Sequence, residues 1–72
     1  MNMRLLNRHL RRKGLTRGEV ARRLGLSVWR FDHMCRGRRG LEFSLGQALA
    51  LREALGLSIR EMTDLFFAEE LS

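Results

Sequence analysis

The sequence predicts an all-α protein, a compact bundle of five short helices in a single domain of residues 1–72. Three observations predict this fold. The 72 residues include no proline, and the 44% that are hydrophobic are mostly Leu, Ala and Met, which favour helices over strands. Apolar residues recur at helical spacing. Glycine marks the places where helices should end, at Gly14, Gly25, Gly37 and Gly56.

The five predicted helices follow one another through short connections. They span residues 2–13, 17–24, 28–36 and 45–55, and the last runs from Ile59 to Glu69 or beyond. In the first, Met3, Leu6 and Leu10 fall at i, i+3 and i+7 and form one apolar stripe. The second, fourth and fifth each begin with a capping box, Thr16 with Glu19, Ser44 with Gln47 and Ser58 with Glu61. Ser27 is the expected N-cap of the third.

The apolar spacing also predicts which face of each helix is buried. The third should bury Phe31 and Met34, with Cys35 as a further candidate for the inner face. Its other side chains should point elsewhere, namely Val28, Trp29, Arg30, Asp32, His33 and Arg36. The fourth is apolar on most sides and should therefore be the central helix. The expected inner stripe of the fifth is Ile59, Met62, Leu65 and Phe66.

Charge divides the chain into two halves. Residues 1–40 hold 12 Lys+Arg and 2 Asp+Glu, a net of +10, whereas residues 41–72 hold 2 and 6, a net of −4. A basic half joined to an acidic half suggests a polyanion-binding face at one end. Charge alone leaves a second interpretation open, a solvated Arg-rich surface. The single cysteine, Cys35, excludes a disulfide within the chain and fits a reducing cytoplasm.

Residues 16–37, TRGEVARRLGLSVWRFDHMCRG, combine these features. Two short helical patterns meet at the tight turn Gly25-Leu26-Ser27, a geometry that lets the second helix enter a DNA major groove. The chain resembles the Cro/cI-type, or Xre-like, helix-turn-helix domains of phage and bacterial repressors. The resemblance covers about Leu6 to Phe66. It rests on Gly14-Leu15-Thr16, Glu19-Val20-Ala21, Leu24-Gly25-Leu26-Ser27, Phe31, Met34, Gly37, Ser44-Leu45, Ala54-Leu55-Gly56-Leu57-Ser58 and Leu65-Phe66.

This resemblance implies a lambda-repressor-like bundle and a set of DNA-facing positions. Base-reading positions are occupied by Val28, Trp29 and His33, and phosphate-binding positions by Arg17, Arg30, Arg36, Arg38 and Arg39. Trp29 is equally consistent with a protein interface. Leu10 and Cys35 stand where some family members carry an ion pair between the first and third helices, and Phe43 replaces the usual proline before the fourth.

The fifth helix offers a candidate surface for a second copy of the chain. Phe66 and Phe67 are adjacent and cannot both face the same core, so one should be exposed unless another chain covers it. A two-fold dimer would place two recognition helices about 34 Å apart, one turn of DNA.

The sequence therefore predicts a cytoplasmic regulator that binds double-stranded DNA sequence-specifically, a repressor acting as a homodimer on a palindromic operator. The alternative is a protein-interaction module, such as an antitoxin or adaptor, built on the same fold. No catalytic set, glycine-rich phosphate loop or metal-spaced cluster is visible. We expect no enzyme activity, cofactor, small-molecule substrate or membrane association.

Overall fold

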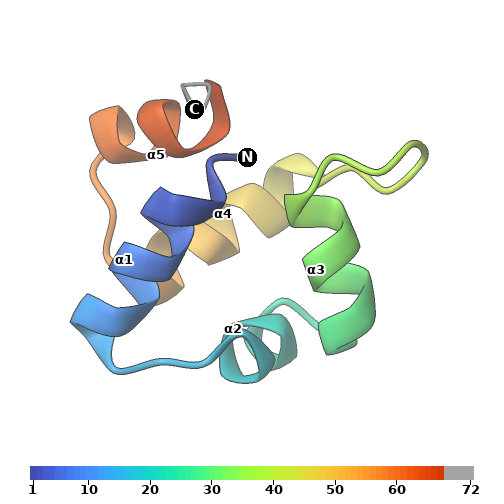
Figure 1. The fold of residues 1–72 in the computed structure, drawn as a ribbon, viewed down its shortest axis with the longest axis horizontal. Helices are drawn as coiled ribbons and strands as arrows, with labels where there is room; N and C mark the ends of the chain where they lie inside the picture. Colours follow the sequence, from blue (N-terminus) through green and yellow to red (C-terminus); the bar gives the residue numbers. More distant parts are fainter. Residues whose placement is uncertain (68–72) are drawn as a thin grey trace.

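A computed structural model of the chain describes residues 1–67 and contains five α-helices in that range (Figure 1). They are α1 (Met3–Lys13), α2 (Arg17–Arg23), α3 (Val28–Cys35), α4 (Leu45–Leu55) and α5 (Ile59–Phe67). The predicted all-α fold and the order of its elements are confirmed, and the bounds predicted for α4 agree at both ends. The expected continuation of α5 to Glu69 lies outside the described residues.

Local hydrogen bonds explain where the helices begin. All three predicted capping boxes form, and both hydrogen bonds of each box measure between 2.9 and 3.1 Å. The Ser27 hydroxyl accepts a hydrogen bond from the Arg30 backbone N–H, which caps α3 as expected. At the C-terminal end of α1, Gly14 has φ +67°, a left-handed conformation that other residues adopt at a cost.

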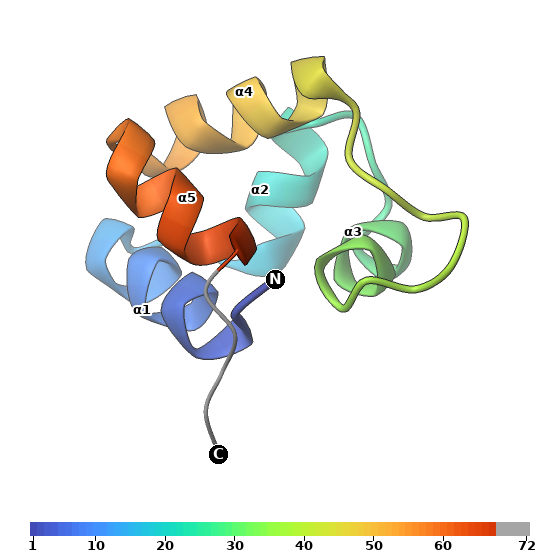
Figure 2. The same ribbon diagram turned by 90° about the horizontal axis from the view of Figure 1, so that it is seen from above.

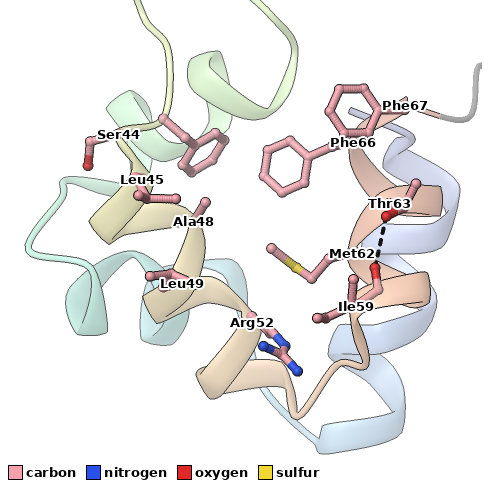
Figure 3. Close-up of a pocket in the computed structure, with 11 residues that line it drawn as sticks. Ser44, Leu45, Ala48, Leu49, Arg52, Ile59, Met62, Thr63, Phe66 and Phe67 are labelled. Carbon is pink, nitrogen blue, oxygen red and sulfur yellow. Dashed lines mark hydrogen bonds between the residues drawn. The ribbon is translucent and has the colours of Figure 1, made fainter.

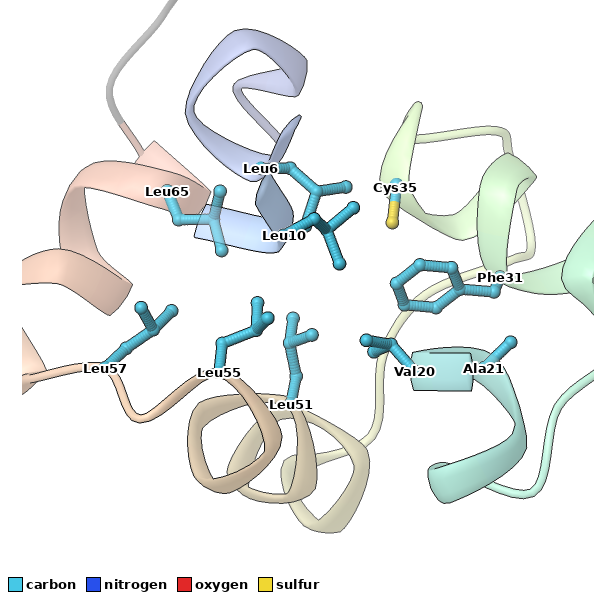
Figure 4. Packing of buried hydrophobic residues seen from close by; sticks show 10 residues of the cluster. All are labelled: Leu6, Leu10, Val20, Ala21, Phe31, Cys35, Leu51, Leu55, Leu57 and Leu65. Atoms are coloured by element: carbon cyan, nitrogen blue, oxygen red, sulfur yellow. The ribbon is translucent and has the colours of Figure 1, made fainter. Parts of the chain in front are cut away.

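The core is one cluster to which all five helices contribute (Figure 4). Its members are Leu6, Leu10, Val20, Ala21, Phe31, Cys35, Leu51, Leu55, Leu57 and Leu65. Leu10 and Cys35, the two positions at which the resemblance implies an ion pair in some proteins, are both buried members of this apolar cluster. Burial, followed by the nearby Asp32 carboxylate, raises the pKa of the Cys35 thiol to about 12, so this side chain stays protonated and behaves as a small apolar group.

Two expectations about burial were wrong. The helix α4 is not enclosed, since Leu45 and Leu49 are 77% and 53% exposed. A sequence that is apolar on most sides does not indicate which side other helices cover, and here they cover the side of Leu51 and Leu55. Ile59, assigned to the inner stripe of α5, is 68% exposed because it lies at the first turn, at the rim of the bundle.

The arrangement of the helices places α3 at one end of the molecule. Both views show α3 and the loop that follows it on the side away from α1 and α5 (Figures 1 and 2). Its main packing partner is α2. None of the helices within residues 1–67 has the length and apolar character needed to cross a membrane.

Candidate nucleic-acid interface

The helix α3 has one anchored face and one exposed face. Phe31 and Cys35 are fully buried, which fixes the rotation of the helix about its axis. Its first turn is open to solvent, with Val28 54% and Trp29 61% exposed and Arg30 also exposed. A helix held in this way presents its N-terminal side chains beyond the surface of the bundle, as a DNA-reading helix must.

The turn between α2 and α3 is held by the backbone. Gly25 has φ +72°, in the left-handed region that favours glycine. The Leu26 N–H donates to the Ala21 carbonyl at 2.9 Å, and the Gly25 N–H donates to the Arg22 carbonyl at 3.0 Å. These bonds use the carbonyl groups at the end of α2 and set the direction in which the chain enters α3.

A polar cluster joins α3 to α1 and α2. One nitrogen of the Arg17 guanidinium lies 2.8 Å from Asp32 Oδ1, and another donates to Asn7 Oδ1 at 2.8 Å. The Arg36 Nε–H donates to Asp32 Oδ2 at 2.9 Å. The hydrogen bond from Arg36, supported by the charges of Arg36 and Arg17, lowers the pKa of Asp32. The carboxylate therefore offsets part of the charge of two arginines and fixes α3 against its neighbours.

A second cluster lies between α3 and the loop after it. The Trp29 and His33 rings, one helical turn apart, have centroids 4.3 Å apart and are tilted by 46°. On the imidazole, Nδ1 accepts a hydrogen bond from Arg38 Nε at 3.2 Å. The Arg38 backbone N–H also donates to the His33 carbonyl at 3.1 Å. Two bonds thus hold the start of the loop against the end of α3.

The remaining predicted phosphate-binding residues are exposed. Arg30 lies on the first turn of α3, and Arg38 and Arg39 lie in the loop. Within residues 1–67 the structure records no ion pair for any of these three. Their charges are available to an external anion, in contrast to those of Arg17 and Arg36.

The structure brings the predicted base-reading and phosphate-binding residues together on α3, the start of α2 and the loop after α3. Sequence reasoning missed the roles of Asn7 and Asp32. The i, i+4 spacing of Asp32 and Arg36 is a recognisable signal for an ion pair. The contacts of Arg17 with Asp32 and Asn7 join three helices, and no local spacing indicates them.

The candidate protein interface lies on another face, between α4 and α5. A shallow groove of about 460 Å³ runs there, with Leu45 and Leu49 on one side and Ile59, Met62 and Phe66 on the other (Figure 3). Phe66 is half-buried and its ring meets Phe43 edge-on at 5.5 Å. Phe67 is 79% exposed, so the two adjacent phenylalanines face different surroundings, as expected.

Comparison with known families supports this description. A family model described as a helix-turn-helix domain matches residues 4–66, a span that begins in α1 and ends one residue before the end of α5. No curated protein matches the chain, and neither does any solved structure. Helix-turn-helix domains of the Xre/Cro-like kind are typical of DNA-binding regulators. Because the match covers almost all of the helical bundle, the chain belongs to this helix-turn-helix domain family.

Proposed function

We propose that the protein is a sequence-specific transcriptional repressor that binds a palindromic operator in double-stranded DNA as a homodimer. The exposed first turn of α3 carries this proposal, because it combines apolar and basic side chains with a firmly buried opposite face. The major groove of B-DNA is about 12 Å wide and admits a helix of this kind.

Base reading is assigned to Val28, Trp29 and His33. The Val28 side chain suits the methyl group of thymine, which proteins read by apolar contact. The His33 imidazole offers a hydrogen bond to a base edge. Trp29 packs beside His33 and extends the apolar surface toward sugar or methyl groups.

Phosphate binding is assigned first to Arg30, Arg38 and Arg39, since no carboxylate is paired with them in the described part of the chain. Arg17 and Arg36 complete the set with smaller contributions, because both already pair with Asp32. Each of these two guanidinium groups uses some of its N–H donors within the protein and has the others left for DNA phosphates.

Dimerisation is assigned to the groove between α4 and α5, with Phe66 and Phe67 at one end of it. The occupant we propose is a second copy of the chain. The groove is lined by four apolar side chains that are more than half exposed, Leu45, Leu49, Ile59 and Phe67, and two-fold contact would bury them on both copies. The dimer would then cover the operator and exclude the polymerase.

Selection of bound fragments from random duplexes tests the proposal, followed by titration of the enriched duplex at several salt concentrations. We expect an enriched palindrome with half-sites one DNA turn apart. The logarithm of affinity should fall with the logarithm of salt concentration by about 0.9 per phosphate contacted. An adaptor or antitoxin that uses these surfaces only on proteins would give neither enrichment nor a steep salt dependence.

A further inference from the structure

We infer that Arg38 is a positioning residue that fixes the tautomer of His33, so that His33 donates a hydrogen bond from Nε2 to a guanine edge in the major groove. The inference rests on the proposed function and deepens it. It names the base that His33 reads and the side chain that makes that reading selective.

The hydrogen bond between the two side chains determines the position of the proton. A guanidinium N–H only donates, so the ring nitrogen that receives it must carry a lone pair. Arg38 Nε lies 3.2 Å from His33 Nδ1. In a neutral imidazole the proton then resides on Nε2, for which the structure records no partner within residues 1–67.

One further ring contact and one backbone hydrogen bond add to this restraint. The Trp29 indole lies against it at a centroid distance of 4.3 Å. The backbone bond from the Arg38 N–H to the His33 carbonyl, at 3.1 Å, keeps the Arg38 side chain next to the ring. A restrained ring with one protonation pattern loses little freedom on binding, which favours affinity for a matching base.

The chemistry of the major groove converts this pattern into a base preference. Guanine presents two acceptors there, N7 and O6, adenine and thymine present one each, N7 and O4, and cytosine presents only its amino group, a donor. An imidazole that donates from Nε2 therefore opposes cytosine and is best matched by guanine, which offers two acceptors and no donor. The other tautomer, with an accepting Nε2, would suit the amino groups of cytosine or adenine instead.

The competing explanation is that Arg38 serves only as a phosphate ligand and touches His33 incidentally. Arg39 provides the matched control, since it is the neighbouring exposed arginine and has no recorded contact with His33. Two substitutions at Arg38 separate charge from hydrogen bonding. In R38Q the amide nitrogen lies the same number of bonds from the backbone as Arg Nε, so an N–H donor remains without the charge, and R38M removes both.

The experiment measures base preference and overall affinity for the wild-type protein, R38Q, R38M and R39M on the selected duplex, and on one whose guanine at the His33 position is exchanged for cytosine. We expect the wild type, R38Q and R39M to prefer guanine by about tenfold, the effect of one well-placed base contact. In R38M this preference should be lost at that base pair only. All three variants should bind every sequence more weakly and with a smaller salt slope.

A double variant and a measurement on the free protein complete the test. H33A/R38M should show no further loss of preference beyond H33A. Nitrogen NMR of the neutral imidazole should show the proton on Nε2 in the wild type and R38Q, and a mixture of tautomers in R38M. Equal guanine preference in R38M and R39M would overturn the inference while sequence-specific binding, and with it the proposed function, still held. Absence of duplex binding by the wild type would overturn both.

Discussion

The two ends of the molecule both expose large apolar side chains, but their electrostatic surroundings differ. On α3, Val28 and Trp29 stand among arginines of a half that carries a net charge of +10 (12 basic and 2 acidic residues in 1–40). The groove between α4 and α5 exposes Leu49 and Phe67 in a half of net charge −4 (2 basic and 6 acidic residues in 41–72). The basic surroundings of α3 favour a polyanion, whereas the groove is lined by apolar and neutral polar side chains and by a single charged one, Arg52, so the same kind of exposed group favours DNA in one place and protein in the other.

Removal of the basic surroundings of α3 should have the largest effect. The triple variant R30Q/R38Q/R39Q should bind its duplex about 100-fold more weakly near physiological salt, with a salt slope smaller by about 2.7, because three phosphate contacts are lost. Fluorescence anisotropy at several salt concentrations measures both quantities. R60Q, an exposed arginine on α5, is the control and should change neither by more than a small factor. A comparable loss in R60Q would show that only total charge matters.

A charge placed in the groove between α4 and α5 should break the dimer and leave the reading surface unchanged. In L49E the carboxylate would be buried against a second copy, so the dimer dissociation constant should rise by at least about tenfold, as for other central apolar contacts. Sedimentation equilibrium measures the dimer, and anisotropy compares a palindrome with a single half-site. Binding to the half-site should persist. An unchanged dimer in both L49E and F67E would exclude this face as the interface.

Substitution of Asp32 should act on stability and DNA affinity in opposite directions. D32N should lower the free energy of unfolding by about 1 kcal/mol, the upper end for partly exposed ion pairs. It should also raise affinity for non-specific DNA several-fold, since two guanidinium groups lose their carboxylate. Urea unfolding and anisotropy measure the two effects. A fall in both quantities would mean that the polar cluster around Asp32 is needed to hold α3 in its binding position.

The pH dependence of the same variant follows from the lowered pKa of Asp32. A carboxylate with a depressed pKa in the folded state contributes stability above its ordinary value of 3.8, and this contribution is lost as the pH falls through the lower folded pKa. The difference in stability between the wild type and D32N should therefore be constant near neutral pH and shrink in acid. Urea unfolding between pH 6 and pH 3 tests it.

The smallest expected effect concerns His9, a buried residue of α1 that belongs to neither of the two surfaces. Burial, then the Arg12 charge, lowers the pKa of His9 from 6.5, and its Nδ1 has no hydrogen-bond partner among residues 1–67. The unfolded chain then binds the proton more readily, so stability should decline as the pH falls below 6.5. H9Q should show a weaker decline in urea unfolding, and since His33 is present in both proteins, equal declines would assign the effect to another group.

The sequence was sufficient to predict the helices but not the contacts between them. Capping boxes and terminal glycines are local signals, so the starts of α2, α4 and α5 were predicted correctly. Coverage of a helix depends on its neighbours, and for that reason the exposure of Leu45 and Ile59 and the burial of Leu57 were not predicted. The candidate base-reading residues were predicted from the family resemblance. The contacts of Arg17 with Asp32 and Asn7 join residues up to 25 positions apart in the sequence, so only the three-dimensional structure reveals them.

The buried thiol of Cys35 has a practical consequence for all of these measurements. Only a thiolate reacts readily with maleimides or disulfide reagents, and a pKa of about 12 leaves almost none of it at neutral pH. The folded protein should therefore be unreactive toward thiol labels, since Cys35 is also fully buried. A single cysteine introduced on the surface can then carry a fluorophore without a prior mutation in the core. The rate at which Cys35 itself is labelled would measure transient opening of the bundle.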